Sequence, residues 1–277
     1  MRRSFTRNLA LAAALTVLAA LTGAWPLLAA RAGAAPAPAA GKTADTTPAV
    51  DPAAIAALDR MGAYLQTLKA FQLDVATERE DVLDSGLKVQ FAEATNLIVR
   101  RPDRLLASVS SDRKERHFLY DGKQFTLWAP RVNFYATAEA PPTIGELIDA
   151  LQDKFGIELP LVDIFLWSSD AGSGAGITEA VDIGPGQVGG ADCEQYAYRG
   201  EGLDWQIWIQ HGEYPLPRKL VITTTTDEAR PQFQAVYTWN LAPAFADADF
   251  TFDPPAGAHR IVLAQTKPEA GASEKEK

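Results

Sequence analysis

The stretch from His117 to Tyr135 constrains the fold more than any other part of the sequence, because it holds three β-prone runs separated by two turns. Asp121-Gly122 stands between the first two runs. Tight hairpin turns favour this pair, since its residues tolerate positive φ. Ala129-Pro130 stands between the second run and the third. The stretch therefore predicts the middle of an antiparallel meander.

The same alternation of apolar and polar residues extends through much of the chain. It runs from Phe71 to Tyr120 and returns from Asp192 to Asn240, with turns rich in Gly and Asp between the runs. We expect an α+β protein built on a large curled antiparallel sheet, an unclosed half-barrel of about 10–11 strands. Helices are expected to cover the concave face of this sheet.

Three segments have helical signals. Asp51-Pro52 supplies an N-cap and a proline in the first turn of a helix that reaches about Lys69. Thr143 and Glu146 form a capping box before a second helix. The apolar run Leu159–Trp167 predicts a short third helix. The second helix carries an apolar stripe on one face, formed by Ile144, Leu147, Ile148, Leu151 and Phe155.

The domain organisation follows from these signals. Residues 51–264 are expected to form a single half-barrel domain, into which residues 143–168 insert as a helical lid. Pro141-Pro142 precedes this insertion, and a Gly/Ser-rich run follows it up to Gly176. Residues 33–50 are an Ala/Pro-rich sequence typical of a flexible linker, and residues 265–277 are a polar tail that we expect to be disordered.

Residues 1–32 have the layout of a secretory signal peptide. Arg2, Arg3 and Arg7 precede an uncharged run from Asn8 to Ala30. The leader is either cleaved or kept as an anchor, and its arginines suit both the Sec and the twin-arginine route. We expect a periplasmic protein with no transmembrane segment once the leader is removed.

Charge and cysteine content narrow the possible partners. Cleavage after Ala32 removes four arginines and changes the net charge from −9 to −13. Such a chain is repelled by phosphate backbones, so nucleic acid is not expected as a partner. Cys193 is the only cysteine, which excludes an internal disulfide. It is either a small apolar residue of a strand or a link to a second chain.

No motif predicts catalysis. Gly184, Gly186 and Gly189 match the spacing of a dinucleotide-binding loop, but they lead into a strand rather than a helix, so we interpret them as a hairpin or bulge. The three histidines lack the spacing of a zinc site. We expect a protein that is not an enzyme and that uses no metal or cofactor.

Apolar and aromatic residues supply the remaining candidate site. An unclosed sheet under apolar helices leaves an interior that its own side chains do not readily fill, and such a cavity suits an acyl chain. An ordinary packed core is the alternative. The residues expected to line the cavity and its lid are Phe125, Leu127, Trp128, Ile144, Leu147, Ile148, Leu151, Phe155, Phe165 and Trp167.

Several segments together resemble a family of predicted periplasmic proteins. They are the leader, DPAAIAALDRMGAYLQTL, FQLDVATERE, RRPDRLLASV, FLYDGKQFTLW and FTFDPPAGA, and the resemblance covers Asp51 to Val262. This family is similar in layout to the periplasmic carrier that escorts lipoproteins to the outer membrane. The resemblance implies an unclosed β-barrel covered by helices. The chain departs from the lipid-anchored receptor of that system, because no cysteine lies near the cleavage region.

We therefore expect an exported, non-enzymatic protein that holds a lipid, an acylated protein or another hydrophobic ligand in its half-barrel. The alternative is a sensor or interaction module of the cell envelope, in which the same groove recognises a protein partner.

The leader yields the first testable prediction. If residues 1–32 direct export with cleavage, the N-terminus of the protein isolated from its own cells should lie at Arg31 or Gly33. N-terminal sequencing or intact mass measures this. An intact Met1 in a soluble cytoplasmic fraction would contradict the expectation.

Overall fold

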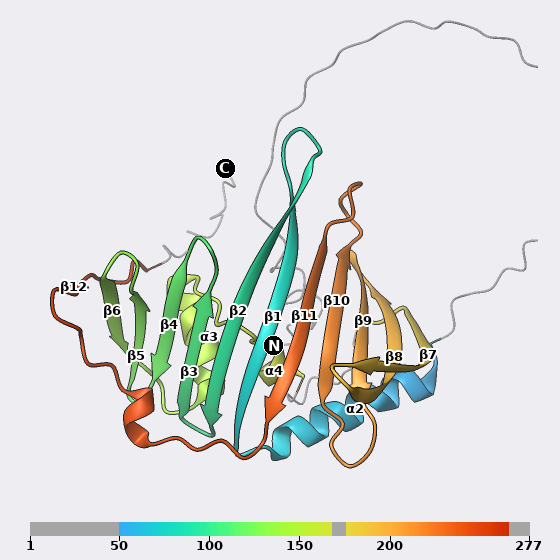
Figure 1. Ribbon diagram of the computed structural model, residues 1–277, viewed down its shortest axis with the longest axis horizontal. Coiled ribbons are helices and arrows are strands. Elements are labelled where there is room, and N and C mark those ends of the chain that lie inside the picture. The colour runs from blue at the N-terminus through green and yellow to red at the C-terminus, as the bar shows by residue number, and fades with distance from the viewer. Residues whose placement is uncertain (1–49, 168–175, 266–277) are drawn as a thin grey trace, which may run out of the picture.

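The structure is a computed structural model that describes residues 50–167 and 176–265. A single sheet of twelve strands forms its framework, in the order β12-β6-β5-β4-β3-β2-β1-β11-β10-β9-β8-β7 (Figure 1). All neighbouring strands are antiparallel except β12 and β6, which are parallel. The sheet is curled and unclosed, which confirms the expected half-barrel. The leader, the linker up to residue 49, the Gly/Ser-rich run at 168–175 and the tail from 266 lie outside the described residues.

The strands form two meanders, one after the other in the chain. The first contains β1 (Ala70–Val82), β2 (Lys88–Arg100), β3 (Arg104–Ser110), β4 (Glu115–Tyr120), β5 (Gln124–Ala129) and β6 (Phe134–Glu139). The second contains β7 (Glu179–Val188), β8 (Ala191–Gly200), β9 (Leu203–Gln210), β10 (Pro217–Thr224) and β11 (Gln232–Asn240), and β12 (His259–Arg260) follows it. The helices are α2 (Pro52–Thr67), α3 (Ile144–Phe155), α4 (Asp163–Leu166) and the 3-10 turn η2 (Asp247–Phe250).

The pairing of β1 with β11 joins the two meanders at the centre of the sheet. Its register runs from Gln72 opposite Asn240 to Arg79 opposite Phe233. Phe71, Leu73 and Val75 alternate along β1 and are buried on one face, as a strand with a period of two requires. This face continues through both meanders and forms the core side of the sheet.

The three helices cover this core side. Buried residues of α2, α3 and α4 belong to the same apolar cluster as the inward residues of the strands. In Figure 1, α3 lies behind β3 and β4, α4 lies behind the centre of the sheet, and α2 runs along the lower end of β7–β9. The expected covering of the concave face is confirmed. In the described part of the chain, no helix is long and apolar enough to cross a membrane.

The ends of the helices match their sequence signals. The Asp51 carboxylate accepts a hydrogen bond from Ala53 N at 2.8 Å at the start of α2. The Thr143 hydroxyl accepts one from Glu146 N at 3.2 Å at the start of α3, and Gly156 ends α3 with φ 62°. The third helix is shorter than expected. Leu161 has φ 58°, which interrupts the run, so that α4 begins only at Asp163.

The glycine-rich segment before β8 forms β7, which we had not predicted as a strand. Its Gly and Pro residues weaken the β signal. A bulge lies between Asp182 and Gly184, and Gly189-Gly190 makes the turn to β8, so the interpretation of these glycines as a bulge or hairpin is confirmed.

The Cys193 side chain on β8 is fully buried. Burial also raises the pKa of its thiol. Because the sulfur is buried, Cys193 is a small apolar residue of a strand rather than a link to a second chain.

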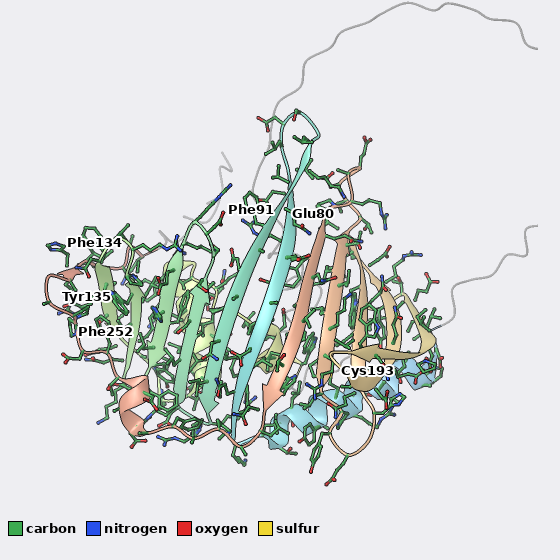
Figure 2. All side chains as sticks on the ribbon, viewed as in Figure 1. Glu80, Phe91, Phe134, Tyr135, Cys193 and Phe252 are labelled. Carbon is green, nitrogen blue, oxygen red and sulfur yellow. The ribbon has the colours of Figure 1, made fainter. Side chains whose placement is uncertain are left out.

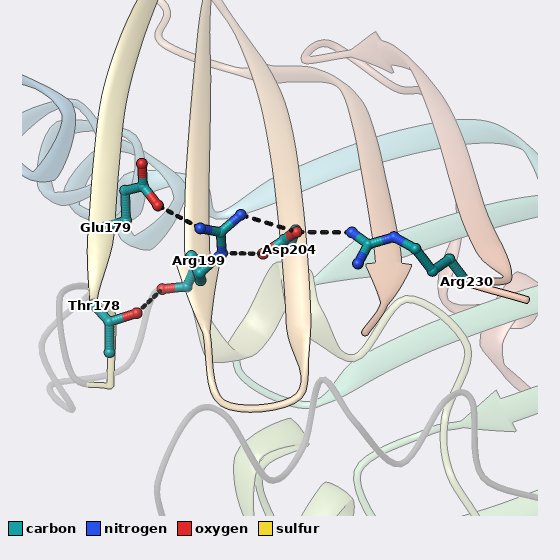
Figure 3. Close-up of polar contacts among 5 residues, drawn as sticks. All are labelled: Thr178, Glu179, Arg199, Asp204 and Arg230. Atoms are coloured by element: carbon teal, nitrogen blue, oxygen red, sulfur yellow. Dashed lines mark hydrogen bonds and ion pairs between the residues drawn. The ribbon is translucent and has the colours of Figure 1, made fainter. Parts of the chain in front are cut away.

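An ion-pair network ties together the ends of three strands (Figure 3). Arg199 on β8 contacts Glu179 on β7 and Asp204 on β9, both at 2.7 Å. Arg230, from the turn before β11, reaches the other oxygen of Asp204 at 3.0 Å. The hydrogen bond from Arg199, aided by Arg230, lowers the pKa of the Asp204 carboxyl. The side chains are partly exposed, so the network fixes strand ends more than it adds to stability.

The C-terminal segment, residues 241–260, covers the outer face of β4–β6. Phe250 is 1% exposed. The Phe252 ring lies 5.0 Å from Tyr135 and 5.5 Å from Trp128, and Figure 2 shows Tyr135 and Phe252 together near the edge of the sheet. His259 N donates to Asn133 O at 2.9 Å, where β12 joins β6. The last strand is therefore the short β12, His259–Arg260.

Phe250 should be the main anchor of the C-terminal segment. We expect Phe250→Ala to lower the free energy of unfolding by about 3–5 kcal/mol, because a fully buried aromatic ring is lost. Phe134→Ala is the matched control, since Phe134 is 41% exposed and should cost less than about 1 kcal/mol. Urea unfolding of both variants measures the difference, and equal losses would contradict the anchoring role.

Candidate functional site

The structure brings nine of the ten predicted cavity residues together on the core side of the sheet. Phe125, Ile144, Leu147, Leu151, Phe165 and Trp167 belong to the buried cluster, and Leu127, Ile148 and Phe155 pack against it. Their side chains pack together between β4–β5 and the helices. A ligand would have to enter by replacing some of these contacts.

Trp128 lies on the opposite face of the sheet, which corrects the expectation that it lines the same interior. Phe125 and Leu127 point to the core, so the next residue along β5 points outward. There Trp128 stacks on His117 at 5.1 Å and lies beside Phe252. Its indole N–H is buried and has no hydrogen-bond partner.

The helical insertion is held to the sheet largely by its apolar side chains. Leu147 and Leu151 of α3 are 1% and 2% exposed. Two polar contacts fix the N-terminal end of α3 to the sheet. Ile144 N donates to Pro102 O at 2.9 Å, and the Tyr120 hydroxyl donates to Pro141 O at 2.5 Å. The stripe of α3 is thus buried by non-directional contacts, which another apolar surface can replace.

Helices α2 and α4 approach each other closely at Gly62. A Cβ atom on Gly62 would lie 2.3 Å from the backbone oxygen of Trp167. Only glycine permits this approach. The contact positions Trp167 at the end of α4, where its indole N–H is buried without a partner.

Arg101 is a polar residue of this interior, and it belongs to the RRPDRLLASV segment of the resemblance. It lies in the turn between β2 and β3, and its guanidinium carbon is 5.4 Å from the centre of the Phe165 ring on α4. Its Nε and Nη2 atoms are buried and have no hydrogen-bond partner. Burial lowers the pKa of Arg101.

A second polar group lies where α4 meets β11. Burial, and to a smaller extent Glu158, raises the pKa of Asp163 to about 6. The residue keeps some exposed surface, but its carboxyl group is surrounded by protein atoms. Burial and the nearby Asp163 also raise the pKa of Tyr237. When the Asp163 carboxyl group is ionised, its burial destabilises the packing of α4 on the sheet.

The described residues contain no group of three side chains suited to a metal ion. The histidines have local partners instead. His117 Nδ1 lies 2.8 Å from the Ser108 hydroxyl, and His211 Nε2 lies 2.8 Å from Glu194.

A separate cavity of about 270 Å³ lies on the outer face, between β4–β6 and the C-terminal segment, with Thr126, Tyr135 and Arg260 among its lining residues. The apolar core side remains the site that the sequence pointed to.

An unclosed half-barrel with an apolar, helix-covered interior defines the structural class of the chain. Within this class, the chain belongs to the DUF2092 family, described as predicted periplasmic proteins. The family model matches residues 54–264. This membership confirms the resemblance seen in the sequence, and it agrees with the periplasmic location expected from the leader.

Solved structures with a similar fold come from several bacteria. LprF from Mycobacterium bovis has a TM-score of 0.42 and 13% identity, over 72% of this chain and 97% of that chain. LppX from Mycobacterium tuberculosis has a TM-score of 0.36 and 13% identity, over 70% and 98%. A LolA superfamily protein from Nitrosomonas europaea has a TM-score of 0.36 and 10% identity, over 72% of this chain and 97% of that chain. No curated protein matches the chain. The likeness is one of fold alone.

Asp163 should make stability depend on pH. Its pKa in the folded protein, about 6, lies above the ordinary value of 3.8, so folding favours the protonated form. The contribution of Asp163 to stability is then largest below pH 4 and falls as the pH rises to 6. Asp163→Asn should raise the free energy of unfolding at pH 7 by up to about 3 kcal/mol, with no gain below pH 4.

Urea unfolding at pH 4 and pH 7 tests this expectation. Asp149→Asn, on the exposed side of α3, is the control and should leave stability unchanged at both pH values. A loss of stability in Asp163→Asn at pH 7 would show that the ionised carboxylate has a favourable partner in the fold.

Proposed function

We propose that this protein is an exported, non-enzymatic binding protein, which holds a hydrophobic ligand between the concave face of its sheet and the helices α3 and α4. One observation carries the proposal. The amphipathic helix α3 buries its apolar stripe against a sheet that does not close on itself. A ligand with an apolar chain can take the place of that stripe without exposing the sheet to water.

The exchange is energetically balanced because similar surfaces replace each other. The closed form buries Leu147 and Leu151, and displacement of α3 loses this burial. An acyl chain of a lipid, or of an acylated protein, offsets this loss, because it covers the same strands and is itself buried. The directional contacts that must break include those that Ile144 N and the Tyr120 hydroxyl make. Ligand binding and closure of α3 should therefore compete.

The competition predicts opposite effects on stability and on affinity. Leu147→Ala and Leu151→Ala should each lower the free energy of unfolding by about 2–5 kcal/mol, because the leucines are fully buried. Each should also tighten the binding of a fluorescent fatty acid by about tenfold or more, since opening costs less. Urea unfolding and fluorescence titration measure the two effects.

Leu119→Ala is the matched control. Leu119 is also buried, but it lies on the outer face of β4, away from the core cluster that contains α3. This variant should lose stability without any gain in affinity. If all three variants bind the probe no better than the wild type, α3 is plain core. Recognition of a protein partner would then replace ligand carriage as the favoured function.

A further inference from the structure

Three arginines surround the turn between β2 and β3, and they differ in their partners. Arg100 points to the outer face, where it forms an ion pair with Asp247 and lies over the Phe250 ring at 5.6 Å. Arg104 pairs with Asp103 at 2.8 Å. Arg101 lies on the core side, over Phe165. Among the described residues, no carboxylate forms an ion pair with Arg101.

An unpaired guanidinium in this place is costly. Its Nε and Nη2 groups have lost their water and have gained no acceptor. Leaving a buried donor without an acceptor costs about 1–3 kcal/mol, and the cost is larger for a charged group. Burial is also the cause that lowers the pKa of Arg101. When α3 and α4 cover the sheet, Arg101 therefore has two buried N–H donors without an acceptor.

The two unpaired atoms define the shape of the missing acceptor. Nε and Nη2 share one edge of the planar guanidinium, and this edge meets two oxygens of a carboxylate or phosphate group in parallel hydrogen bonds. A single hydroxyl or carbonyl would satisfy only one of them. The donors thus suit an anion with two oxygens on one atom.

The position of Arg101 connects this anion to an apolar chain. Phe165, on which the guanidinium lies, belongs to the core cluster that also contains Leu147 and Leu151. The turn that carries Arg101 also anchors the start of α3, because Pro102 O accepts the hydrogen bond from Ile144 N. An amphiphile lying along the core side under α3 would therefore have its head at this end of the sheet.

We propose that Arg101 binds the anionic head of an amphiphile, a carboxylate or a phosphate ester, whose apolar chain occupies the place of the α3 stripe. This inference rests on the proposed function and specifies its ligand class. The overall charge of the chain is negative, so Arg101 acts as a local exception that selects the head group inside the fold rather than attracting anionic surfaces from outside.

The test compares ligands that share a chain and differ in the head. Dodecanoate, dodecyl phosphate and methyl dodecanoate displace a neutral fluorescent hydrophobic probe from the full-length mature protein. The wild type should bind at least one of the two anions about tenfold or more tightly than the ester. The stronger of the two identifies the head group. Inorganic phosphate alone should not displace the probe, because it lacks the chain.

Three variants locate the effect. Arg101→Met should bind the anions and the ester equally, with its affinity for the ester unchanged. Arg101→Lys should keep part of the preference, as a cation without the two-donor edge. Arg100→Met is the matched control, one residue away and outward-facing, and should keep the full preference. Without ligand, Arg101→Met should be at least as stable as the wild type, because an unpaired buried charge is removed.

The outcomes separate the two hypotheses. If the wild type binds the ester as tightly as both anions, or if Arg101→Met keeps the preference, the assignment of Arg101 is wrong while the proposed function stands. If none of the three ligands displaces the probe, the proposed function itself fails. The comparison of heads in the wild type decides the inference even if a variant does not fold.

Discussion

Burial of one apolar face is the constraint on which the rest of this structure depends. A curled sheet that does not close presents the inward side chains of eleven long strands along its length, and α2, α3 and α4 must cover them to form a core. The close approach of Gly62 on α2 to the backbone of Trp167 lets two of these helices cover the sheet side by side. The proposed binding site is the same surface, so stability and function draw on one set of contacts.

Local signals were sufficient wherever a few neighbouring residues determine the geometry. Asp121-Gly122 forms the expected turn, in which the Asp121 carboxylate accepts hydrogen bonds from Lys123 N and Gln124 N and Gly122 has φ 85°. The caps of α2 and α3 also follow from their sequences. The alternation of side chains along β5 also predicts the position of Trp128, because Leu127 and Trp128 cannot point to the same face of a strand.

Features that depend on distant parts of the chain were not accessible in this way. β12 becomes a strand only because the chain returns to β6 after crossing the outer face, and Phe250 finds its place by the same route. Arg101 and Arg100 look equivalent in the sequence. Only the packing of Asp247 on one side of the sheet and of Phe165 on the other gives them different environments.

The pairing of β1 with β11 has a consequence for the order in which the chain can fold. The centre of the sheet joins strands from opposite ends of the domain, so it closes only after residue 240 has been synthesised. Until then one edge of β1 is unpaired, and such edges invite aggregation and slow folding. A chain translocated unfolded would carry that edge into the periplasm, and a chain translocated folded would close it beforehand. The export route therefore decides which compartment must protect the nascent sheet.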